Sequence, residues 1–208
     1  IKNKENTGFG AANNTAIQRA KGELILMLNS DIVVLDDAIS KLVAYFNAHS
    51  EIDFLGGKLL NTDHTPQASC GPFMSLWIVF LMLFAQGERF GVTRYSPDSP
   101  RKVDWISGAC ILTKKKTFES LSGFDEGIFL YMEEVELLYR AREKGYSVWF
   151  TPVSQFIHVG SASSKEWKTP IMNLYKGLIH FYTKHESPIE VSILRVLLAV
   201  KALVGIAV

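Results

Sequence analysis

The fold is decided by the stretch Gly22-Glu23-Leu24-Ile25-Leu26-Met27-Leu28-Asn29-Ser30-Asp31, in which an unbroken apolar run ends abruptly in polar residues. The run is short for a helix and predicts a strand buried on both faces of a mostly parallel sheet, although a buried helical turn shows the same lack of alternation. Ligands of open α/β sheets bind at the carboxyl ends of strands, so Asn29 and Asp31 are expected to point into a crevice. The alternative is a turn or helix cap before Leu35, because the same residue types suit those positions.

The composition indicates one globular domain, with room for a small appendage. The chain has 208 residues, of which 48% are hydrophobic, and this is enough to bury a full core. Lysine and arginine total 22 against 21 aspartates and glutamates, so the charge gives no sign of a nucleic-acid partner. Cys70 and Cys110 lack the spacing of metal ligands. They predict free buried thiols in a reducing compartment, with a single disulfide as the alternative.

Two apolar segments suggest contact with a membrane surface. Residues 73–85 are the most hydrophobic window of the chain and are too short to span a bilayer, so they either pack inside or lie in a membrane surface. Residues 189–208 are apolar apart from three charges and suit an interfacial helix or the beginning of a membrane segment. A helix packed on the domain or on a partner chain is the alternative. We expect a main domain over 1–185 and an apolar helix over 186–208.

The start of the chain is polar and has no initiating Met, so we expect a sequence cut from something longer, at its end as well as at its start.

A glycine-containing loop over 7–14 leads into a helix over 15–20 that Gly22 closes. Such a loop can present N–H groups to a phosphate or a base, or can form a plain tight turn. Apolar periodicity predicts a further helix over 35–46, and a short basic helix is expected to begin over 114–119 and end at Ser122-Gly123. Strands are expected over 52–60, 103–113 and 145–152.

The run Glu133-Glu134-Val135-Glu136 places three carboxylates at the start of a predicted helix. Favourable interaction with the helix dipole, together with a Glu136–Arg140 pair, is a sufficient structural explanation for Glu136. The preceding Tyr131-Met132 would form a partly desolvated mouth, in which the pKa of a carboxylate rises toward that of a general base. Glu134 is the candidate base.

His158 precedes Gly160 and several serines, which would allow a loop to fold over a ligand. A metal or phosphate contact and a purely structural role are both open for this imidazole.

Six motifs in register strongly resemble the family 2 glycosyltransferases, especially their rhamnosyltransferase-like branch. They run from the first residues to about Ser164 and are Asn6-Thr7-Gly8-Phe9-Gly10-Ala11-Ala12-Asn13, Leu28-Asn29-Ser30-Asp31, Ser107-Gly108-Ala109, Gly123-Phe124-Asp125-Glu126, Phe129-Leu130-Tyr131-Met132-Glu133-Glu134-Val135-Glu136 and His158-Val159-Gly160-Ser161-Ala162-Ser163.

The resemblance implies an α/β, GT-A-like fold, with a Rossmann-like mixed sheet flanked by helices, and inverting transfer of a sugar from a nucleotide diphosphate. It also implies a role for each matching residue. The catalytic residues would be Glu134 as base with Glu133 beside it, and a Mg²⁺ or Mn²⁺ ion would be held by Asp31 and His158. The donor would be bound by Asn6, Gly8, Asn13, Asn29 and Asp31. The acceptor or a loop would be served by Trp105, Glu136 and Ser163.

The sequence departs from the family pattern in three respects. Asn29 stands where many relatives carry the first aspartate, although the rhamnosyltransferase-like branch commonly has Asn there. Glu134 and Glu136 replace the usual aspartates, which lengthens both side chains by a methylene. The family's opening strand, with the acidic residues that grip the nucleotide base, lies before Ile1, so a complete donor site is not expected in this chain alone.

The expected function is therefore transfer of a sugar, with rhamnose from a dTDP- or UDP-linked donor as the expected case, to a lipid-linked or polysaccharide acceptor at the cytoplasmic face of the cell membrane. Two alternatives stay open at this point. One is a metal-dependent nucleotidyltransferase, which needs carboxylates but no base opposite the diphosphate. The other is an inactive module with the same fold that binds a glycan or a partner.

Overall fold

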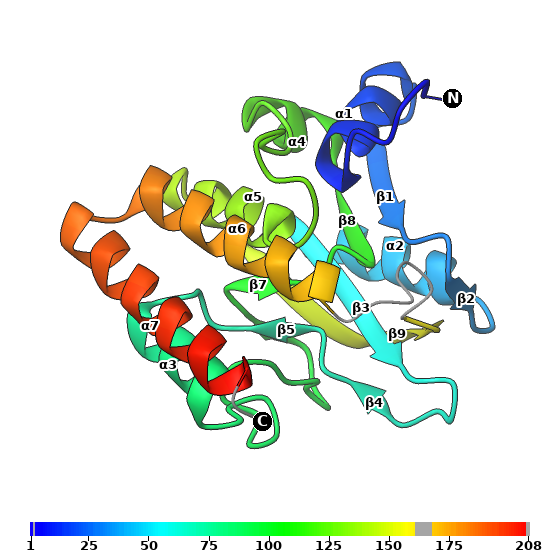
Figure 1. Cartoon of the computed structure of the whole chain (residues 1–208). Helices are drawn as coiled ribbons and strands as arrows, with labels where there is room; N and C mark the ends of the chain where they lie inside the picture. The colour runs from blue at the N-terminus through cyan, green and yellow to red at the C-terminus, as the bar shows by residue number, and fades with distance from the viewer. Residues whose placement is uncertain (2, 161–167, 207–208) are drawn as a thin grey trace.

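The computed structural model describes Ile1, residues 3–160 and residues 168–206. Its main sheet has the strand order β1 (Leu24–Leu28), β8 (Cys110–Lys114), β3 (Phe54–Leu60), β9 (Val148–His158) and β2 (Ile32–Val34), as Figure 1 shows. Two short strands extend it, since β4 (Pro66–Gln67) pairs with β3 and β6 (Arg101–Lys102) pairs with β9. A separate ribbon joins β5 (Cys70–Gly71) to β7 (Trp105–Ile106).

The sheet is mixed, as expected, but the expectation that it is mostly parallel is wrong for the described strands. Only β3 and β9 pair in parallel, whereas β8 runs antiparallel to both β1 and β3, and β2 runs antiparallel to β9. Strands β1, β3 and β9 therefore share one direction, and β8 is a reversed strand inserted between two of them. Residues Cys110 to Thr113 of β8 are all buried, so their pattern matches that of an interior parallel strand and does not reveal the direction.

The decisive apolar run does form a strand, but it is not buried on both faces. Only Ile25 and Met27 of β1 are fully buried, and Leu24, Leu26 and Leu28 are half-buried. Strand β1 lies at one end of the described sheet, which leaves its outer edge without a described partner.

The sheet separates two hydrophobic cores. On one face α2 (Ala38–Ala48) packs Ala38, Leu42 and Phe46 against strand residues that include Leu55 and Phe156. On the other face α5 (Glu133–Glu143) and α6 (Lys168–His185) cover Phe54 and Phe150. Two further helices, α1 (Phe9–Arg19) and α4 (Lys115–Ser120), lie together beside β1 and β8 (Figure 1).

Helices α3 (Leu76–Phe84) and α7 (Pro188–Ile206) pack on each other, and α7 also packs on α6. The 73–85 window packs inside in part, because Val79 is fully buried, while Trp77 is 64% exposed. Its contact with a membrane surface stays a prediction. The second apolar segment likewise buries Leu194 and Leu198 and exposes its opposite face. Within the described residues, no helix combines the length and apolarity needed to cross a membrane.

Other boundaries differ modestly from the expected ones. Helix α1 begins six residues early, at Phe9, and the strand expected over 103–113 is divided into β7 and β8 by a turn at 107–109. The strand expected to end at 152 continues to His158.

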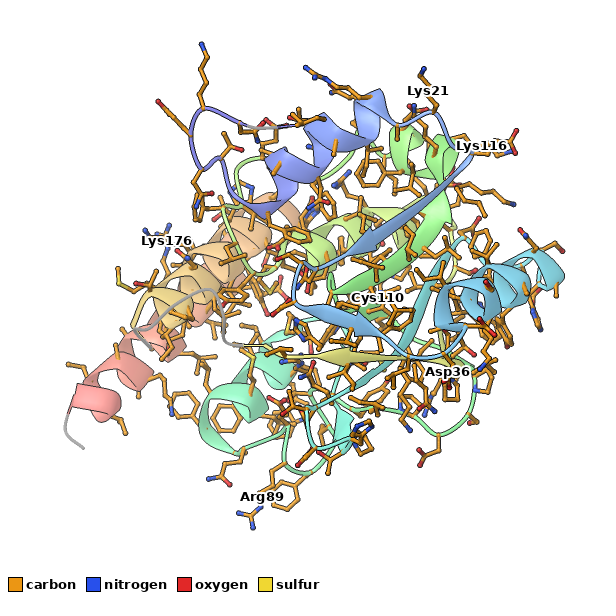
Figure 2. All side chains as sticks on the ribbon, turned by 90° about the vertical axis from the view of Figure 1, so that its right-hand side faces the viewer. Lys21, Asp36, Arg89, Cys110, Lys116 and Lys176 are labelled. Atoms are coloured by element: carbon orange, nitrogen blue, oxygen red, sulfur yellow. The ribbon has the colours of Figure 1, made fainter. Side chains whose placement is uncertain are left out.

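Cys70 and Cys110 are free and buried, as predicted. Figure 2 shows Cys110 in the interior, while Lys21, Lys116 and Arg89 point outward.

Candidate active site

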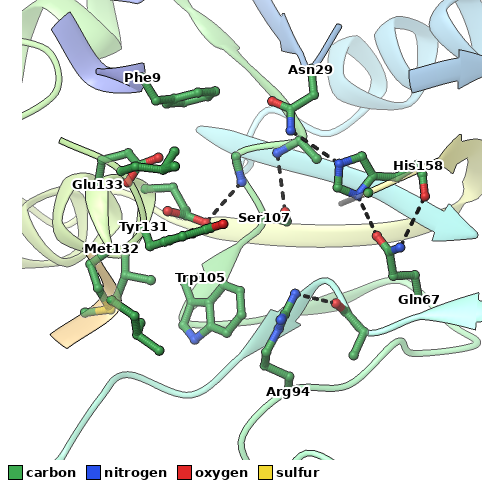
Figure 3. A pocket seen from close by; sticks show the side chains of 18 of the residues that line it. Phe9, Asn29, Gln67, Arg94, Trp105, Ser107, Tyr131, Met132, Glu133 and His158 are labelled. Carbon is green, nitrogen blue, oxygen red and sulfur yellow. Dashed lines mark hydrogen bonds between the residues drawn. The ribbon is translucent and has the colours of Figure 1, made fainter. Parts of the chain in front are cut away.

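A cavity of about 590 Å³ opens where several of the predicted motifs meet (Figure 3). This volume is in the usual range for small-molecule sites. Its described lining includes residues from the segment after β1, the 107–109 turn, the segment entering α5 and the end of β9, with further residues from β4, the 88–94 segment and helices α1, α3 and α6. Asn29 and His158 lie at one side of the cavity, and Tyr131 and Glu133 lie at the other (Figure 3).

Backbone pairing between β2 and β9 brings Asp31 and His158 together. Ile32 is opposite His158 in the antiparallel ladder, and the Val159 N–H donates to the Asp31 carbonyl at 3.0 Å. As a result, His158 Nε2 lies 3.4 Å from Asp31 Oδ1 and 3.3 Å from Asn29 Nδ2. The expected neighbourhood of Asn29, Asp31 and His158 is therefore present in the fold.

One carboxylate and one imidazole cannot complete the coordination of a cation. The described residues contain no group of three or more His, Cys, Asp or Glu side chains that could hold a metal. Mg²⁺ is usually bound by one or two carboxylates, with substrate phosphates and water as the other ligands, and such a cation fits this donor set. Asp31 and His158 are the residues that would hold it, with substrate oxygens completing the shell.

The opposite wall is built by a turn at the start of α5. Tyr131 and Met132 have φ values of 67° and 77°, the left-handed region that side-chain-bearing residues rarely adopt. The turn packs closely on α6, where a Cβ added to Gly177 would lie 2.7 Å from the Tyr131 carbonyl oxygen. The turn directs Glu133 and Glu134 to the cavity, and the Gly108 N–H donates to Glu134 Oε1 at 3.4 Å.

Both acidic side chains on this wall are poorly solvated. The Oε2 atoms of Glu133 and Glu134 are buried without a hydrogen-bond partner. Burial raises the pKa of Glu134, and the Gly108 N–H and the Arg94 charge oppose this. Burial, reinforced by the Glu134 charge, raises the pKa of Glu133 to about 8. A carboxylate with a raised pKa next to a cavity is the environment predicted for a general base.

The three residues predicted to serve the acceptor or a loop are placed differently. The Glu136 carboxylate is fully buried and accepts hydrogen bonds from Arg140, Lys184 and His185. The pair with Arg140 was predicted from the sequence, and the contacts with Lys184 and His185 on α6 were not. Trp105 does line the cavity. Ser163 lies outside the described residues.

The glycine loop makes protein contacts. Gly8 has φ 89°, and an added Cβ would lie 2.3 Å from the Phe129 carbonyl oxygen. That close approach accounts for the glycine. Asn6 Oδ1 accepts from the Gly8 N–H, and Asn13 Nδ2 donates to the Phe9 carbonyl. None of Asn6, Gly8 and Asn13 is among the described lining residues, so their binding of a donor stays a prediction.

The structure adds lining residues that the sequence did not single out. Gln67 Oε1 lies 2.7 Å from His158 Nδ1. Arg94 is the one lysine or arginine among the described residues lining the cavity; its guanidinium donates to the Ala68 carbonyl and lies over the Trp105 ring. Both residues come from segments without the apolar periodicity of a helix or strand. The sequence therefore contains no pattern from which their positions in the cavity could be predicted.

The raised pKa of Glu133 predicts a pH-dependent stability. Because the folded protein keeps this proton to higher pH than the unfolded chain, the free energy of unfolding should fall between about pH 5 and about pH 8. Glu133→Gln removes the titration of this group and leaves that of Glu134, so we expect its Tm to vary less over this range and to exceed that of the wild type near pH 8. Scanning calorimetry checks this, with Glu143→Gln on the exposed side of α5 as control. A variant whose Tm follows the wild type at every pH would contradict the assignment.

Comparison with known proteins identifies the family. Residues 1–121 match the model of Glycosyl transferase family 2. The chain is 31% identical over 166 residues to O-antigen biosynthesis protein RfbC of Myxococcus xanthus, covering 76% of this chain and 12% of the relative. It is 28% identical over 162 residues to rhamnosyltransferase WbbL of Escherichia coli, covering 73% of this chain and 60% of the relative. A 60-residue segment is 38% identical to an N-acetylglucosaminyl-diphospho-decaprenol L-rhamnosyltransferase of Mycobacterium tuberculosis, covering 29% of this chain and 20% of the relative.

Solved structures share the fold at low sequence identity. GalNAc-T7, solved with UDP, GalNAc and Mn²⁺, superposes with a TM-score of 0.57 at 19% identity, covering 88% of this chain and 38% of that one. The mannosyltransferase PcManGT from Pyrobaculum calidifontis, solved with GDP-Man and Mn²⁺, gives a TM-score of 0.55 at 16% identity, covering 94% of this chain and 50% of that one. The fold is thus GT-A-like, as predicted. By its family match, this chain belongs to glycosyl transferase family 2.

Proposed function

We propose that this chain is the catalytic part of an inverting glycosyltransferase that moves a sugar from a nucleotide diphosphate to an acceptor in cell-surface glycan synthesis. One observation carries the proposal. A desolvated carboxylate, Glu134, and the Asp31–His158 pair line the same cavity of about 590 Å³. The names of the relatives support rhamnose as the transferred sugar. A dTDP- or UDP-linked donor is part of the proposal.

In this proposal Glu134 is the general base. Its carboxylate takes the proton of the acceptor hydroxyl as that oxygen bonds to the anomeric carbon, while the bond from that carbon to the diphosphate breaks. Asn29, Asp31 and His158 hold the diphosphate side of the donor. A bound Mg²⁺ or Mn²⁺ would neutralise charge on the departing nucleotide. The Gly108 N–H holds Glu134 in place, and Arg94 favours its ionised form.

The acceptor in this proposal is lipid-linked. The lining contains Met74 and Met82 near α3, Leu130 before α5, and Leu174 on α6, so one part of the cavity is apolar. The same cavity contains the Arg94 guanidinium, which suits a phosphate group of an acceptor. The mycobacterial relative is named for N-acetylglucosaminyl-diphospho-decaprenol, a sugar linked to a lipid through a diphosphate. That name supports this acceptor class.

We further propose that a surface formed by α3 and α7 rests on the cytoplasmic face of the cell membrane, with residues 1–185 as the catalytic domain and 186–208 as a membrane-facing helix. Exposed apolar residues follow one face of α7 at intervals of three or four, and the adjacent α3 exposes two aromatic side chains. This α3–α7 surface consists of Trp77, Phe80, Ile189, Ile193, Val196, Val200 and Leu203. Because Met82 of α3 also lines the cavity, the surface would deliver a lipid-linked acceptor to the site.

The Glu134 assignment predicts separate effects on chemistry and on donor binding. Glu134→Gln keeps the shape and the contact with Gly108 but cannot take a proton, so transfer should fall by about 10²–10⁴-fold. Donor affinity, measured by calorimetric titration with Mn²⁺, should stay unchanged. Glu143→Gln, on the exposed side of α5, is the control and should retain transfer. Full transfer by Glu134→Gln would refute the base. Loss of transfer with Mn²⁺-dependent donor binding intact would count against a nucleotidyltransferase, which needs no base opposite the diphosphate.

The α3–α7 surface predicts binding to lipid vesicles. Replacing exposed apolar side chains with charges, in a Trp77→Glu and Val196→Glu double variant, should reduce co-sedimentation with vesicles of bacterial lipid composition, because the charged side chains resist transfer into the interface. Val153→Glu, at an exposed position of β9, is the matched control and should bind as the wild type does. Equal sedimentation of all three proteins would contradict the proposed surface.

A further inference from the structure

Gln67 connects the cavity to an exposed turn between β3 and β4. It lies opposite Leu59 in the β3–β4 pairing, and Leu59 is opposite Phe156 in the β3–β9 pairing. From this position its side chain reaches the end of β9 and contacts His158 twice. Gln67 Oε1 is 2.7 Å from His158 Nδ1, and Gln67 Nε2 donates to the His158 carbonyl at 3.3 Å (Figure 3).

The neighbours of Gln67 fix which end of its amide faces the imidazole. Its nitrogen lies next to two acceptors, the His158 carbonyl and Asn61 Oδ1, the latter at 3.0 Å. A carbonyl oxygen cannot donate, so the amide nitrogen belongs on that side. The amide oxygen of Gln67 is then the atom that faces His158 Nδ1.

The hydrogen bonds beyond Gln67 impose the same direction. Asn61 Nδ2 donates to Thr65 Oγ1 at 2.9 Å, and the Thr65 hydroxyl donates to Asp63 Oδ1 at 2.6 Å. An ionised carboxylate can only accept, so Asp63 sets the direction of every bond in the chain. Donors therefore run from His158 through Gln67, Asn61 and Thr65 to Asp63.

This direction determines the tautomer of His158. Since Gln67 Oε1 is an acceptor, Nδ1 carries the hydrogen of the neutral ring and Nε2 carries the lone pair. The Asn29 amide nitrogen, 3.3 Å away, also donates to Nε2. Nε2 and Asp31 Oδ1 are then both electron-pair donors 3.4 Å apart, and a cation that displaces the Asn29 contact would take both as ligands.

We propose that Gln67 is a positioning residue, which holds His158 in the Nδ1–H tautomer so that Nε2 and Asp31 together can bind a divalent cation on the nucleotide diphosphate. This rests on the proposed function, but the tautomer can be tested without it. Without Gln67, the ring gains by moving its hydrogen to Nε2 and donating to Asp31. That bond would join the two ligand atoms to each other and remove both from the cation.

The test compares Gln67→Met, which keeps the length without the amide, with Gln67→Glu, which keeps an acceptor for Nδ1–H. Long-range ¹H–¹⁵N NMR of the whole chain at about pH 8, where an ordinary histidine is neutral, reports which ring nitrogen carries the hydrogen. We expect Nδ1–H in the wild type and in Gln67→Glu, and a shift toward Nε2–H in Gln67→Met. Melting curves establish that each variant is folded.

The second readout is Mn²⁺ affinity in the presence of dTDP or UDP, followed by electron paramagnetic resonance. Loss of a residue that orients a metal-binding histidine typically weakens binding by about 10–100-fold, which we expect for Gln67→Met with substantial recovery in Gln67→Glu. An Nε2–H tautomer in the wild type, or a folded Gln67→Met with unchanged tautomer and Mn²⁺ affinity, would overturn the proposal. If the wild type showed the Nδ1–H tautomer but no Mn²⁺–nucleotide binding, the cation role would fail while the hydrogen-bond assignment held.

Discussion

The antiparallel ladder between β2 and β9 is the constraint on which the site depends. Asn29 and His158 are 129 positions apart, and without this pairing nothing in the local sequence would join them. The ladder is firmly placed because β9 also pairs in parallel with β3 along most of its length, and every residue of β3 is buried. Burial of the central strands therefore fixes the distance between Asp31 and His158, although both side chains are partly exposed to the cavity.

The acidic wall depends on a second set of contacts, between α5 and α6. Two consecutive left-handed residues cost about 1–3 kcal/mol each, so the turn at Tyr131 and Met132 requires support from its surroundings. Close packing on Gly177 and burial of the Met132 side chain provide that support. The Glu136 carboxylate adds to it by binding Arg140 on its own helix and Lys184 and His185 on α6. Each wall of the cavity is thus connected to the packed interior.

Much of this arrangement was readable from the sequence because local patterns carried it. The end of an apolar run located Asp31, and three carboxylates after an aromatic segment located the start of α5. Strand direction was not readable, since β8 has the same buried pattern whether it runs parallel or antiparallel to its neighbours. The continuation of β9 to His158 was missed as well, because Pro152 suggested the end of a strand.

The side chains that surround the predicted residues were the least predictable part. Gln67 sits in a two-residue strand and Arg94 in an irregular segment, so neither belongs to a periodic pattern. Their places depend on pairings between distant segments, such as the bridge of Cys70 with Tyr95 beside Arg94. Glu136 shows the opposite case: its spacing from Arg140 correctly predicted a pair four residues apart, and that pair occupies the carboxylate.

The central claim is that the nucleotide diphosphate and its cation bind between Asp31 and His158, across the cavity from Glu134. The most direct measurement is paramagnetic broadening of the backbone amide NMR signals by trace Mn²⁺ in the presence of dTDP or UDP. The account predicts that broadening is strongest at Asp31 and Val159 and decreases toward α5, and that Asp31→Asn reduces it. Broadening centred on Glu133 and Glu134, or unaffected by Asp31→Asn, would contradict it.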